Sequence, residues 1–571
     1  FWNVDSKLAA FFPERPTEVA ASNHDHGDVV RFLGSHQDET TIHCRVGLAT
    51  AASRYEVEIA PGQEISRVVI MPMEPLNPRF FSYSRFTPAF LTQKRHEVEK
   101  SWRQKMAEGT QFELPDPRYQ ACTEAAKATL LLLNDGHEVT AGPMTYHRHW
   151  FRDAAYILNA LDKLGYAEEV RRNLTFFPLK QWKNGYFSSQ KGEWDSNGQA
   201  IWTIVEHWRL TGDLESLREL YTAIRKGALW IDKKRHDVHF SPAKPRGLMP
   251  AGFSAEHLGP NDYYYWDNFW SLRGMMDAME AAEALGEERD RAAFERAASA
   301  YRRDLEESIN RDLERSAAGA LPAAPGRRPD AGMIGNVAAA YPLKLYFPEE
   351  TPWLLKTVNF IRDHLFHDEG FYQAMIHSGV NSYLTLQVAQ CMLLAGDLGA
   401  FQLMDYMLKL ASPTWCWPEA IHPRTLGGCM GDAHHGWAAA EWVLIMRNLV
   451  VHEHRDVLQI TRLLPSEWCR PGQRVGIAKA PTTFGTVSVR VEFGGTGEAS
   501  ETLTLEADWR RPPREIRWYL PAAGRRVMDA EGGAVRLEGA MAILEPGVRR
   551  VRLEVDLEQV PSMEEGAVPG L

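Results

Sequence analysis

One loop of this sequence carries a lone carboxylate and runs directly into a cluster of aromatic residues. Within 247–273, Glu256 lies among Gly and Pro residues, and the aromatic run 263–266 follows it. Cleavage of a glycosidic bond requires a carboxylic acid over the leaving oxygen, and flat aromatic side chains suit a sugar ring. The apolar neighbours Phe253 and Leu258 predict a raised pKa for Glu256, so that this side chain stays protonated and acts as an acid. The simpler alternative is a loop that packs its aromatic residues into a helical core.

A second carboxylate, Glu419, lies in the segment WPEAIHP near several basic side chains. His422 and Arg424 follow it closely, and His434 and His435 come shortly afterwards. Positive or hydrogen-bond-donating neighbours keep a carboxylate ionised, which suits a general base that activates water. A structural salt bridge to Arg424 is the alternative. Two carboxyl groups on separate loops suit the spacing of roughly 6.5–9.5 Å in inverting glycosidases better than the closer spacing in retaining ones.

Both glutamates belong to a set of six long polar segments, each of which comes just before an apolar helical pattern. The segments are rich in Asp, Glu, His, Arg and Trp, and they span 147–154, 192–199, 254–268, 326–336, 375–383 and 417–437. The connections at the opposite ends of the helices are short and plain. If the six helices run parallel, the six segments meet on one face and form a pocket.

The side chains in these segments that suit sugar binding are acidic, basic or aromatic. They are His149, Trp150, Arg152, Asp153, Trp194, Asp195, Tyr264, Trp266, Asp330, His377, Trp417, His434 and His435. Asp153, Asp195, Asp267 and Asp330 each lie near a helix start, where an Asp can instead cap the helix or interact with its dipole. Capping and ligand binding do not exclude one another.

Helical patterns follow one another between residues 116 and 452, with almost no strand pattern among them. We expect twelve helices, beginning near residues 118, 151, 167, 198, 214, 265, 287, 332, 352, 380, 400 and 433. The even-numbered patterns open with small or apolar stretches such as AAYILNAL and GWAAAEWVLIM, whereas the odd-numbered ones are charged on one face. A helix that is apolar nearly all round is buried, and an amphipathic one lies outside. Six buried helices inside six amphipathic ones form an (α/α)6 barrel.

Antiparallel β-structure is predicted at both ends of the chain. Alternating apolar residues occur at 53–59 and 64–71, and again at 486–493 and 502–507, with Pro and Gly turns between them. The predicted organisation is mainly α, with antiparallel β-sandwich domains flanking the barrel. It comprises an N-terminal β-sandwich (1–85), a helical linker (86–115), the (α/α)6 catalytic barrel (116–452) and a C-terminal β-sandwich with a tail (453–571). We expect no catalytic group in either β region, because charged and apolar residues alternate there as on a solvated sheet face.

The order of the helical motifs resembles a known enzyme family. WFRDAAYILNAL, then WDSNGQAIWTIVEHWRLTGD, then the acidic loop before the aromatic helix, then WPEAIHP, is similar to glucoamylase-type enzymes of glycoside hydrolase family 15 and to other six-hairpin glycosidases. The resemblance covers roughly 116–451. It implies that Glu256 is the general acid, that Glu419 is the general base, and that Arg152 and Asp153 grip the sugar. The chain departs from that family in lacking an aromatic-Glu-Glu or Trp-Glu motif around Glu256. Asp267 is the rival acid, because YWDNFW resembles the aspartate-bearing loops of some related barrel enzymes.

Composition narrows the classes of partner. The formal net charge is −11 and the sequence pI is near 6.0, without a long Lys/Arg run, which disfavours nucleic acid and anionic membranes. No apolar run approaches the roughly 20 residues of a membrane helix.

The six cysteines are scattered without CxxC spacing, which favours reduced thiols in a cytoplasmic protein over a disulfide frame or a zinc site. Secretion stays open, because the sequence begins at Phe1 without Met. The adjacent histidines at 434–435 lack metal-ligand spacing, so we expect no metal and no cofactor; an oligomer is compatible with the sequence.

Three other classes of protein compete with a hydrolase acting on an oligosaccharide or glycoside. A sugar phosphorylase shares the β-sandwich and barrel plan but needs a phosphate cradle, for which Arg424, His434 and His435 near GGCMGD are candidates. A non-catalytic carbohydrate-binding barrel is disfavoured by a carboxylate in each of the two expected loops. A toroid-type polysaccharide lyase is disfavoured because it grips uronates with several Arg and Lys, whereas this mouth is mainly acidic.

Overall fold

The structure, a computed structural model, describes residues 1–35, 41–73, 77, 86–237, 245–253, 261–374, 378–494 and 500–555. The chain divides into two compact units, Phe1–Gln104 and Lys105–Leu571. The predicted acid Glu256, the candidate His377 and the predicted tail lie outside the described residues.

The first unit contains short antiparallel strands. Strand β1 (Trp2–Val4) pairs with β2 (Lys7–Ala10), and β3 (Glu18–Ser22) pairs with β4 (Thr50–Arg54). The strand that we predicted at 53–59 is observed earlier in the chain, as β4. Within the second predicted strand, 64–71, only Ile70 pairs with another residue, through a single bridge to Phe11. Alternation of apolar residues marks a possible strand, but a strand also needs a hydrogen-bonding partner, which the local pattern does not specify. A 3-10 helix, η1 (Val29–Phe32), follows β3, and helix α1 (Pro88–Glu108) crosses into the second unit.

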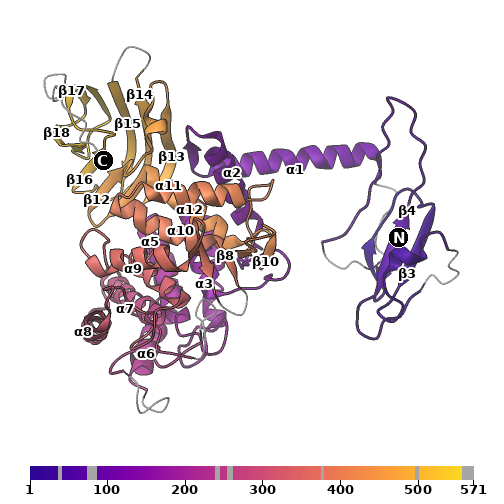
Figure 1. The fold of residues 1–571 in the computed structure, drawn as a ribbon, viewed down its shortest axis with the longest axis horizontal. Coiled ribbons are helices and arrows are strands. Elements are labelled where there is room, and N and C mark those ends of the chain that lie inside the picture. Colours follow the sequence, from indigo (N-terminus) through magenta and orange to yellow (C-terminus); the bar gives the residue numbers. More distant parts are fainter. Residues whose placement is uncertain are drawn as a thin grey trace, which may run out of the picture. The chain divides into compact units, whose positions relative to one another are not determined.

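The described part of the second unit includes the twelve predicted helical segments, each of which starts within three residues of its predicted position (Figure 1). Their bounds are α2 (Pro117–Leu132), α3 (Phe151–Lys163), α4 (Ala167–Leu174), α5 (Ser196–Thr211), α6 (Leu214–Arg235), α7 (Tyr265–Leu285), α8 (Glu288–Arg315), η5 (Ala331–Ala339), α9 (Pro352–Leu365), α10 (Ser382–Ala395), α11 (Gly399–Leu410) and α12 (Gly436–Val450). A further 3-10 turn, η4 (Phe177–Lys180), follows α4. The segment expected as an α-helix near residue 332 is instead the 3-10 helix η5. Its two glycines weaken α-helix propensity, and Pro342 shortly after it cannot continue a helix.

Every second one of these twelve segments, counted from α3, contacts the next one, and the six together form a closed cycle. Helices α3, α5, α7, η5, α10 and α12 each contact the next, and α12 contacts α3. Nearly every residue of α10 and α12 is buried, whereas α8 buries one stripe of its long amphipathic surface. Each of the other six helices packs on members of this cycle, as α6 does on α5 and α7. Hydrophobicity around the whole circumference therefore places six segments inside and six outside.

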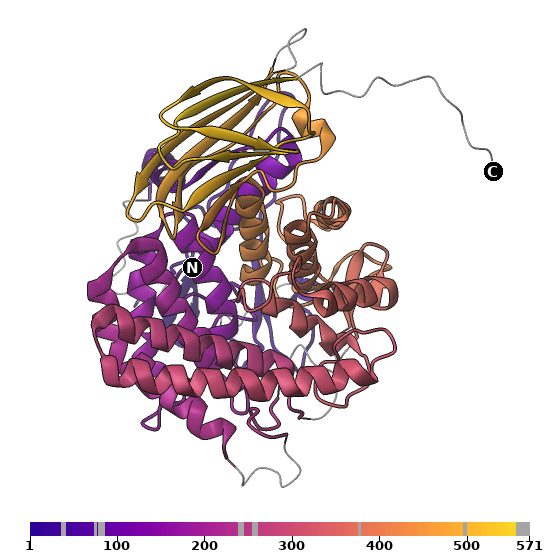
Figure 2. The same ribbon diagram turned by 90° about the vertical axis from the view of Figure 1, so that its left-hand side faces the viewer.

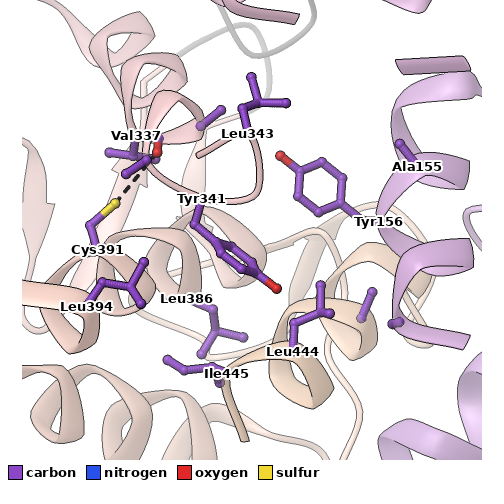
Figure 3. Packing of buried hydrophobic residues seen from close by; sticks show 14 of the residues in the cluster. Ala155, Tyr156, Val337, Tyr341, Leu343, Leu386, Cys391, Leu394, Leu444 and Ile445 are labelled. Atoms are coloured by element: carbon purple, nitrogen blue, oxygen red, sulfur yellow. Dashed lines mark hydrogen bonds between the residues drawn. The ribbon is translucent and has the colours of Figure 1, made fainter. Parts of the chain in front are cut away.

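The buried interior joins side chains that are far apart in the sequence. Val337 of η5, Leu386 of α10 and Leu444 of α12 belong to one buried cluster (Figure 3). In the same cluster the Cys391 thiol donates to the Val337 carbonyl at 3.6 Å. All six cysteines are free. No helix in the described part of the chain combines the length and the apolar character needed to cross a bilayer.

Two sheets follow the helices and pack against one end of the helical ring (Figure 2). The first has the order β11-β12-β16-β19-β18 and the second has the order β17-β20-β15-β14-β13-β5. Their bounds are β5 (Gln111–Glu113), β11 (Val451–His454), β12 (Val457–Ile460), β13 (Arg474–Thr482), β14 (Gly485–Phe493), β15 (Ser500–Trp509), β16 (Glu515–Tyr519), β17 (Arg525–Glu531), β18 (Val535–Glu538), β19 (Met541–Leu544) and β20 (Arg550–Val555). Strand β13 contacts α3, α5 and α12, so the second sheet rests on the inner helices.

Two features of these sheets differ from the prediction. Strand β5 comes from the predicted linker 86–115 and pairs with β13, more than 350 residues later in the chain. The pair β12–β16 is parallel, although all the other pairs in the two sheets are antiparallel. The predicted strands at 486–493 and 502–507 coincide with β14 and most of β15.

A small sheet inserted among the helices was not predicted. It has the order β10-β9-β8-β7-β6, with β6 (Phe366–His367), β7 (Gly370–Gln373), β8 (Gly379–Asn381), β9 (Ala420–Ile421) and β10 (Gly428–Met430). Because β8 leads directly into α10 and β9 follows Glu419, this sheet holds the Glu419 main chain beside the start of α10. The Ser382 N–H donates to the Glu419 carbonyl at 3.3 Å.

Candidate functional site

The polar segments before the inner helices are tied to one another by hydrogen bonds. Asp432, just before α12, accepts main-chain N–H bonds from Met144, Thr145 and Tyr146 at 2.8, 2.9 and 3.2 Å. Burial opposes ionisation of Asp432, but these donors outweigh it and lower the pKa of the carboxyl. The segments before α3 and α12 therefore lie side by side, and an ionised aspartate fastens them together.

The predicted base, Glu419, is held by an aromatic stack. Its side chain is buried, and the Tyr383 hydroxyl donates to Oε1 at 3.1 Å. The Tyr383 ring stacks on His435 with centroids 5.2 Å apart and on Trp437 with centroids 4.1 Å apart. A Cβ added at Gly431 would lie only 2.7 Å from the Glu419 Cβ, so only glycine fits against the carboxylate there. These contacts fix the position of the carboxylate before any substrate binds.

The alternative interpretation of Glu419, a salt bridge to Arg424, is not observed. Arg424 is exposed, and no ion pair joins it to Glu419 within the described ranges. His435, which we expected as a positive or donating neighbour of Glu419, is buried and carries a pKa lowered to about 3, chiefly by desolvation. It is therefore neutral near pH 7. Its Nε2 lies 3.9 Å from Asp153 Oδ1, while His434 is half-buried.

A buried cluster joins the starts of α3, α5 and α7. Asp195 Oδ2 accepts from Arg152 Nε at 2.9 Å, from Gln199 Nε2 at 2.9 Å and from Trp266 Nε1 at 2.7 Å. Arg152 also lies 3.4 Å from Glu193 Oε1. Asp195 thus orients Arg152 and does not cap its own helix, whose first N–H groups it does not bind.

Asp267, the rival acid, lies beside this cluster. Only 1% of Asp267 is exposed, and neither carboxyl oxygen has a partner among the residues that the structure describes. Burial, and then the charge of Asp195, raise the pKa of Asp267 well above its ordinary value. A Cβ added at Gly252 would lie 3.0 Å from Asp267 Oδ2, so the main chain of Gly252 packs directly against the carboxyl. Burial therefore favours the protonated form of Asp267 over the ionised form.

Only one of the four aspartates near helix starts acts as a cap. Asp330 accepts from the Gly332 N–H at 2.9 Å and from Arg327 Nε at 2.6 Å. Asp153 and Asp267 lie in the first turns of α3 and α7, after the N-cap residues Trp150 and Tyr264. Capping therefore accounts for Asp330, and the first-turn positions of Asp153 and Asp267 match the helix-dipole alternative.

The predicted aromatic residues fall into two groups. Trp150 and Trp194 are half-buried; the Arg148 guanidinium lies 3.9 Å from the Trp150 ring and the Lys234 ammonium lies 4.3 Å from the Trp194 ring. Tyr264, Trp266 and Trp417 are each 1% exposed.

Burial separates three of the predicted sugar-binding residues from an open surface. Trp417 donates its N–H to the Met407 carbonyl at 2.8 Å and packs on Trp442, which places it in the helical core. His149 packs against Phe151 and Phe177, and burial lowers its pKa to about 3. Trp266 contributes its N–H to the Asp195 cluster, where it positions a carboxylate.

Glu256 and His377 are not located by the structure, but residues bordering the loop of Glu256 are. Main-chain hydrogen bonds of 2.9 and 3.2 Å pair Gly252 with Asp262, and Trp194 Nε1 donates to the Ala251 carbonyl at 3.2 Å. The two borders of this loop therefore lie together, next to Trp194 and Asp267.

Several site residues were missed by sequence analysis. Tyr383, Gly252 and Asp432 contact predicted residues only through tertiary structure. Gln199 had a local signal, because it lies four residues after Asp195 on one helix face. Within the described ranges, no group of three or more His, Cys, Asp or Glu side chains is arranged to hold a metal ion.

Comparison with known proteins points to glycosidases. No protein-family model matches the chain. An uncharacterised glycosyl hydrolase of Methanocaldococcus jannaschii is 28% identical over 148 residues, which are 23% of this chain and 24% of that protein. An α-L-rhamnosidase from Dictyoglumus thermophilum has a similar fold, with a TM-score of 0.56, 13% identity and coverage of 78% of this chain and 50% of that chain.

A GH78-family rhamnosidase of Bacillus sp. GL1 is also similar, with a TM-score of 0.52, 19% identity and coverage of 72% of this chain and 43% of that chain. The chain thus matches half or less of the length of each of these three proteins. The names of all three indicate glycoside hydrolases. The two rhamnosidases share a fold with most of this chain.

Proposed function

We propose that this protein is a glycoside hydrolase whose helical ring is an (α/α)6 barrel with the active site at the mouth formed by the starts of the inner helices. The observation that carries the proposal is the pair of buried carboxyl groups in unlike surroundings. Asp267 is buried, raised in pKa and without a partner among the described residues, while Glu419 accepts a hydrogen bond from Tyr383. Carboxyl groups in contrasting environments are typical of acid and base assignments in glycosidases.

In the proposed mechanism Glu419 is the general base. Its carboxylate takes a proton from the water that attacks the anomeric carbon, and Tyr383 holds the carboxylate in position. A carboxylic acid across the pocket donates a proton to the glycosidic oxygen as the bond to the anomeric carbon breaks. Water then adds opposite to the leaving group, and the product has inverted configuration.

Two residues are candidates for the acid. The family 15 resemblance favours Glu256, and the burial and raised pKa of Asp267 favour Asp267. Arg152, oriented by Asp195, is placed to bind sugar hydroxyl groups together with Asp153. Trp150 and Trp194 keep exposed surface and are the better stacking platforms among the predicted tryptophans.

The substrate is an oligosaccharide or a small glycoside. The rhamnosidase fold neighbours make α-L-rhamnosides one set of compounds to test, and the resemblance to glucoamylase-type enzymes makes α-D-glucosides another. A screen of aryl glycosides of both sugars and both anomeric configurations identifies the ring that is cleaved. Proton NMR of the first-formed anomer then tests inversion, and a product with the substrate's configuration would contradict the mechanism.

Carboxylate variants test the two roles. Glu419→Gln keeps the side chain's shape but removes the base, and we expect a loss of about 10²–10⁴-fold in kcat with little change in binding. The acid variant, either Glu256→Gln or Asp267→Asn, is expected to impair substrates with poor leaving groups far more than activated aryl glycosides. Asp213→Asn is the control, because Asp213 lies outside the six polar segments and accepts from the Ser216 N–H at 2.9 Å as the cap of α6.

The same variants can also overturn the assignment. If only Asp267→Asn affects poor leaving groups, Asp267 is the acid and Glu256 is not. Full activity in Glu419→Gln, Glu256→Gln and Asp267→Asn would show that this is not a two-carboxylate glycosidase. Sugar release that requires inorganic phosphate would identify a phosphorylase instead.

A further inference from the structure

A second cavity lies at the opposite end of the inner helices from the proposed active site. Its volume is about 570 Å³, within the range of small-molecule pockets, and it lies between the helices and the C-terminal sheets. Arg209 near the end of α5 and Glu280 near the end of α7 line it, whereas Asp195 and Asp267 lie at the starts of the same helices. The cavity is therefore separate from the proposed catalytic mouth.

The lining of this cavity is rich in positive charge. It contains six Arg or Lys side chains and three Glu side chains. Three of the cations make ion pairs with carboxylates: Arg209 pairs with Glu206 at 2.7 Å and with buried Asp277, Arg273 also pairs with Asp277, and Arg455 pairs with Glu350 at 2.6 Å. The other three, Lys344, Arg510 and Arg511, make no carboxylate ion pair in the described part of the chain.

Lys344 is held at the cavity by a backbone conformation that non-glycine residues rarely adopt. Its φ angle is 51°, in the left-handed region, which is unfavourable for a residue with a side chain. The ammonium donates only to the Glu453 main-chain carbonyl, at 3.2 Å, among the described residues. Burial lowers the pKa of Lys344 by more than the nearby carboxylates of Glu453 and Glu206 raise it, so a further anion beside it would relieve the cost of keeping it charged.

Arg510 and Arg511 bring two more cations from the C-terminal sheets. Arg510 donates to the main-chain carbonyls of Arg209, Leu210 and Thr482 at 2.9, 2.6 and 3.1 Å. These carbonyls orient the guanidinium but carry no formal charge that would neutralise it. Gly212 permits this approach, since a Cβ there would lie 3.1 Å from Arg510 Cδ. Arg511 is exposed and has no carboxylate within ion-pair distance in the described ranges.

We propose that this cavity binds the phosphate group of a phosphorylated sugar. A phosphate monoester carries up to two negative charges and three acceptor oxygens, which matches convergent Arg and Lys donors better than a single carboxylate does. Half-buried Trp208 and Phe347 line the same cavity and offer apolar surface to the attached sugar ring. This ligand differs from an uncharged glycoside at the catalytic mouth, and the proposal does not depend on the catalytic assignment.

Calorimetric titration of the full chain tests the proposal without any activity measurement. The probes are glucose 6-phosphate, inorganic phosphate and uncharged glucose. We expect both phosphate compounds to bind, with glucose 6-phosphate the tighter, and that binding to weaken about tenfold or more in Arg511→Gln and in Lys344→Asn. Asn is chosen at 344 because it tolerates a positive φ angle. Arg526→Gln is the matched control, because Arg526 is an exposed arginine of β17 outside the cavity, and binding should be unchanged.

The outcomes separate the possible ligands. Equal binding of both phosphate compounds would show that the cavity takes free phosphate and that the aromatic wall contributes nothing. Absence of binding by either phosphate compound would overturn the proposal. So would binding that Arg511→Gln leaves unchanged, and Arg511 serves this purpose even if the Lys344 variant fails to fold, because its side chain is exposed. Binding of glucose as tight as that of glucose 6-phosphate would contradict recognition of the phosphate.

Discussion

The Tyr383 hydroxyl donates a hydrogen bond of 3.1 Å to Glu419 Oε1, and the same ring stacks on Trp437 with centroids 4.1 Å apart. Tyr383 lies at the start of α10 and Glu419 lies just before β9, so the two residues come from different polar segments. The small sheet that contains β8 and β9 holds these segments together. The orientation of the proposed base is therefore a property of three segments, and not of the motif WPEAIHP alone.

Removal of the Tyr383 hydroxyl should impair turnover while preserving the fold. A hydrogen bond to a charged group contributes about 1.5–3 kcal/mol, so Tyr383→Phe is expected to lower kcat about 10- to 100-fold with a smaller change in KM. Steady-state kinetics on the best substrate measures both constants. Tyr406→Phe is the control, because the Tyr406 hydroxyl bonds to Asp368, which lies outside the proposed site. Equal kinetics for the two variants would show that Tyr383 does not position the base.

Replacement of Asp267 should stabilise the folded protein at neutral and higher pH. Its folded-state pKa is raised, by burial first and by Asp195 second, above an unfolded value of about 3.9. The folded state therefore binds more protons, and stability declines as pH rises from the unfolded pKa towards the folded pKa. Asp267→Asn removes this cost. The melting temperature of the variant should exceed that of the natural chain at pH 8, and the difference should shrink near pH 4.

Asp432 should show the opposite dependence on pH. Its three main-chain hydrogen bonds lower the pKa of the carboxyl, so the stabilisation is present above about pH 3.9 and disappears as pH falls through the lower folded-state pKa. Asp432→Asn cannot accept all three bonds, and we expect a loss of roughly 1–3 kcal/mol in the free energy of unfolding at pH 7. Denaturation by urea at pH 7 and at pH 3 measures this difference. A loss of the same size at both values would contradict the role of the ionised carboxylate.

A single methyl group at position 252 should disrupt the site. A Cβ there would lie 2.5 Å from Trp194 Cδ1 and 3.0 Å from Asp267 Oδ2, so Gly252→Ala must displace one of these side chains. We expect a loss of about 10- to 100-fold in kcat/KM, because misplacement by about 1 Å can cost 10²-fold. The control is Gly286→Ala, at the end of α7, where no atom lies within 4 Å of the added carbon. Its φ angle of 74° disfavours alanine, so this variant should lose stability without a change in kcat/KM. Unchanged kinetics in Gly252→Ala would argue against a site at Asp267.

Local sequence patterns were enough to predict the positions of the helices. Apolar residues around the whole circumference, as in α12, mark a helix that must be buried, and charge on one face marks one that lies outside. These signals span only a few turns of a helix and do not depend on the rest of the chain. The polar segments that contain Arg152 and Glu419 were recognisable for the same reason, since each interrupts such a pattern at a helix start.

The contacts made by those residues depended on tertiary structure. Nothing local to Asp195 distinguishes a helix cap from a partner of Arg152 and Trp266, because the three lie on three different helices. Likewise, alternation along 111–113 cannot show that β5 joins β13, since sheet pairing depends on a strand hundreds of residues away. The sequence alone determined which segments are helical and where chemically reactive residues cluster. The tertiary structure decided which of them are buried together, and burial with a specific neighbour is what sets the protonation state of Asp267 and the orientation of Glu419.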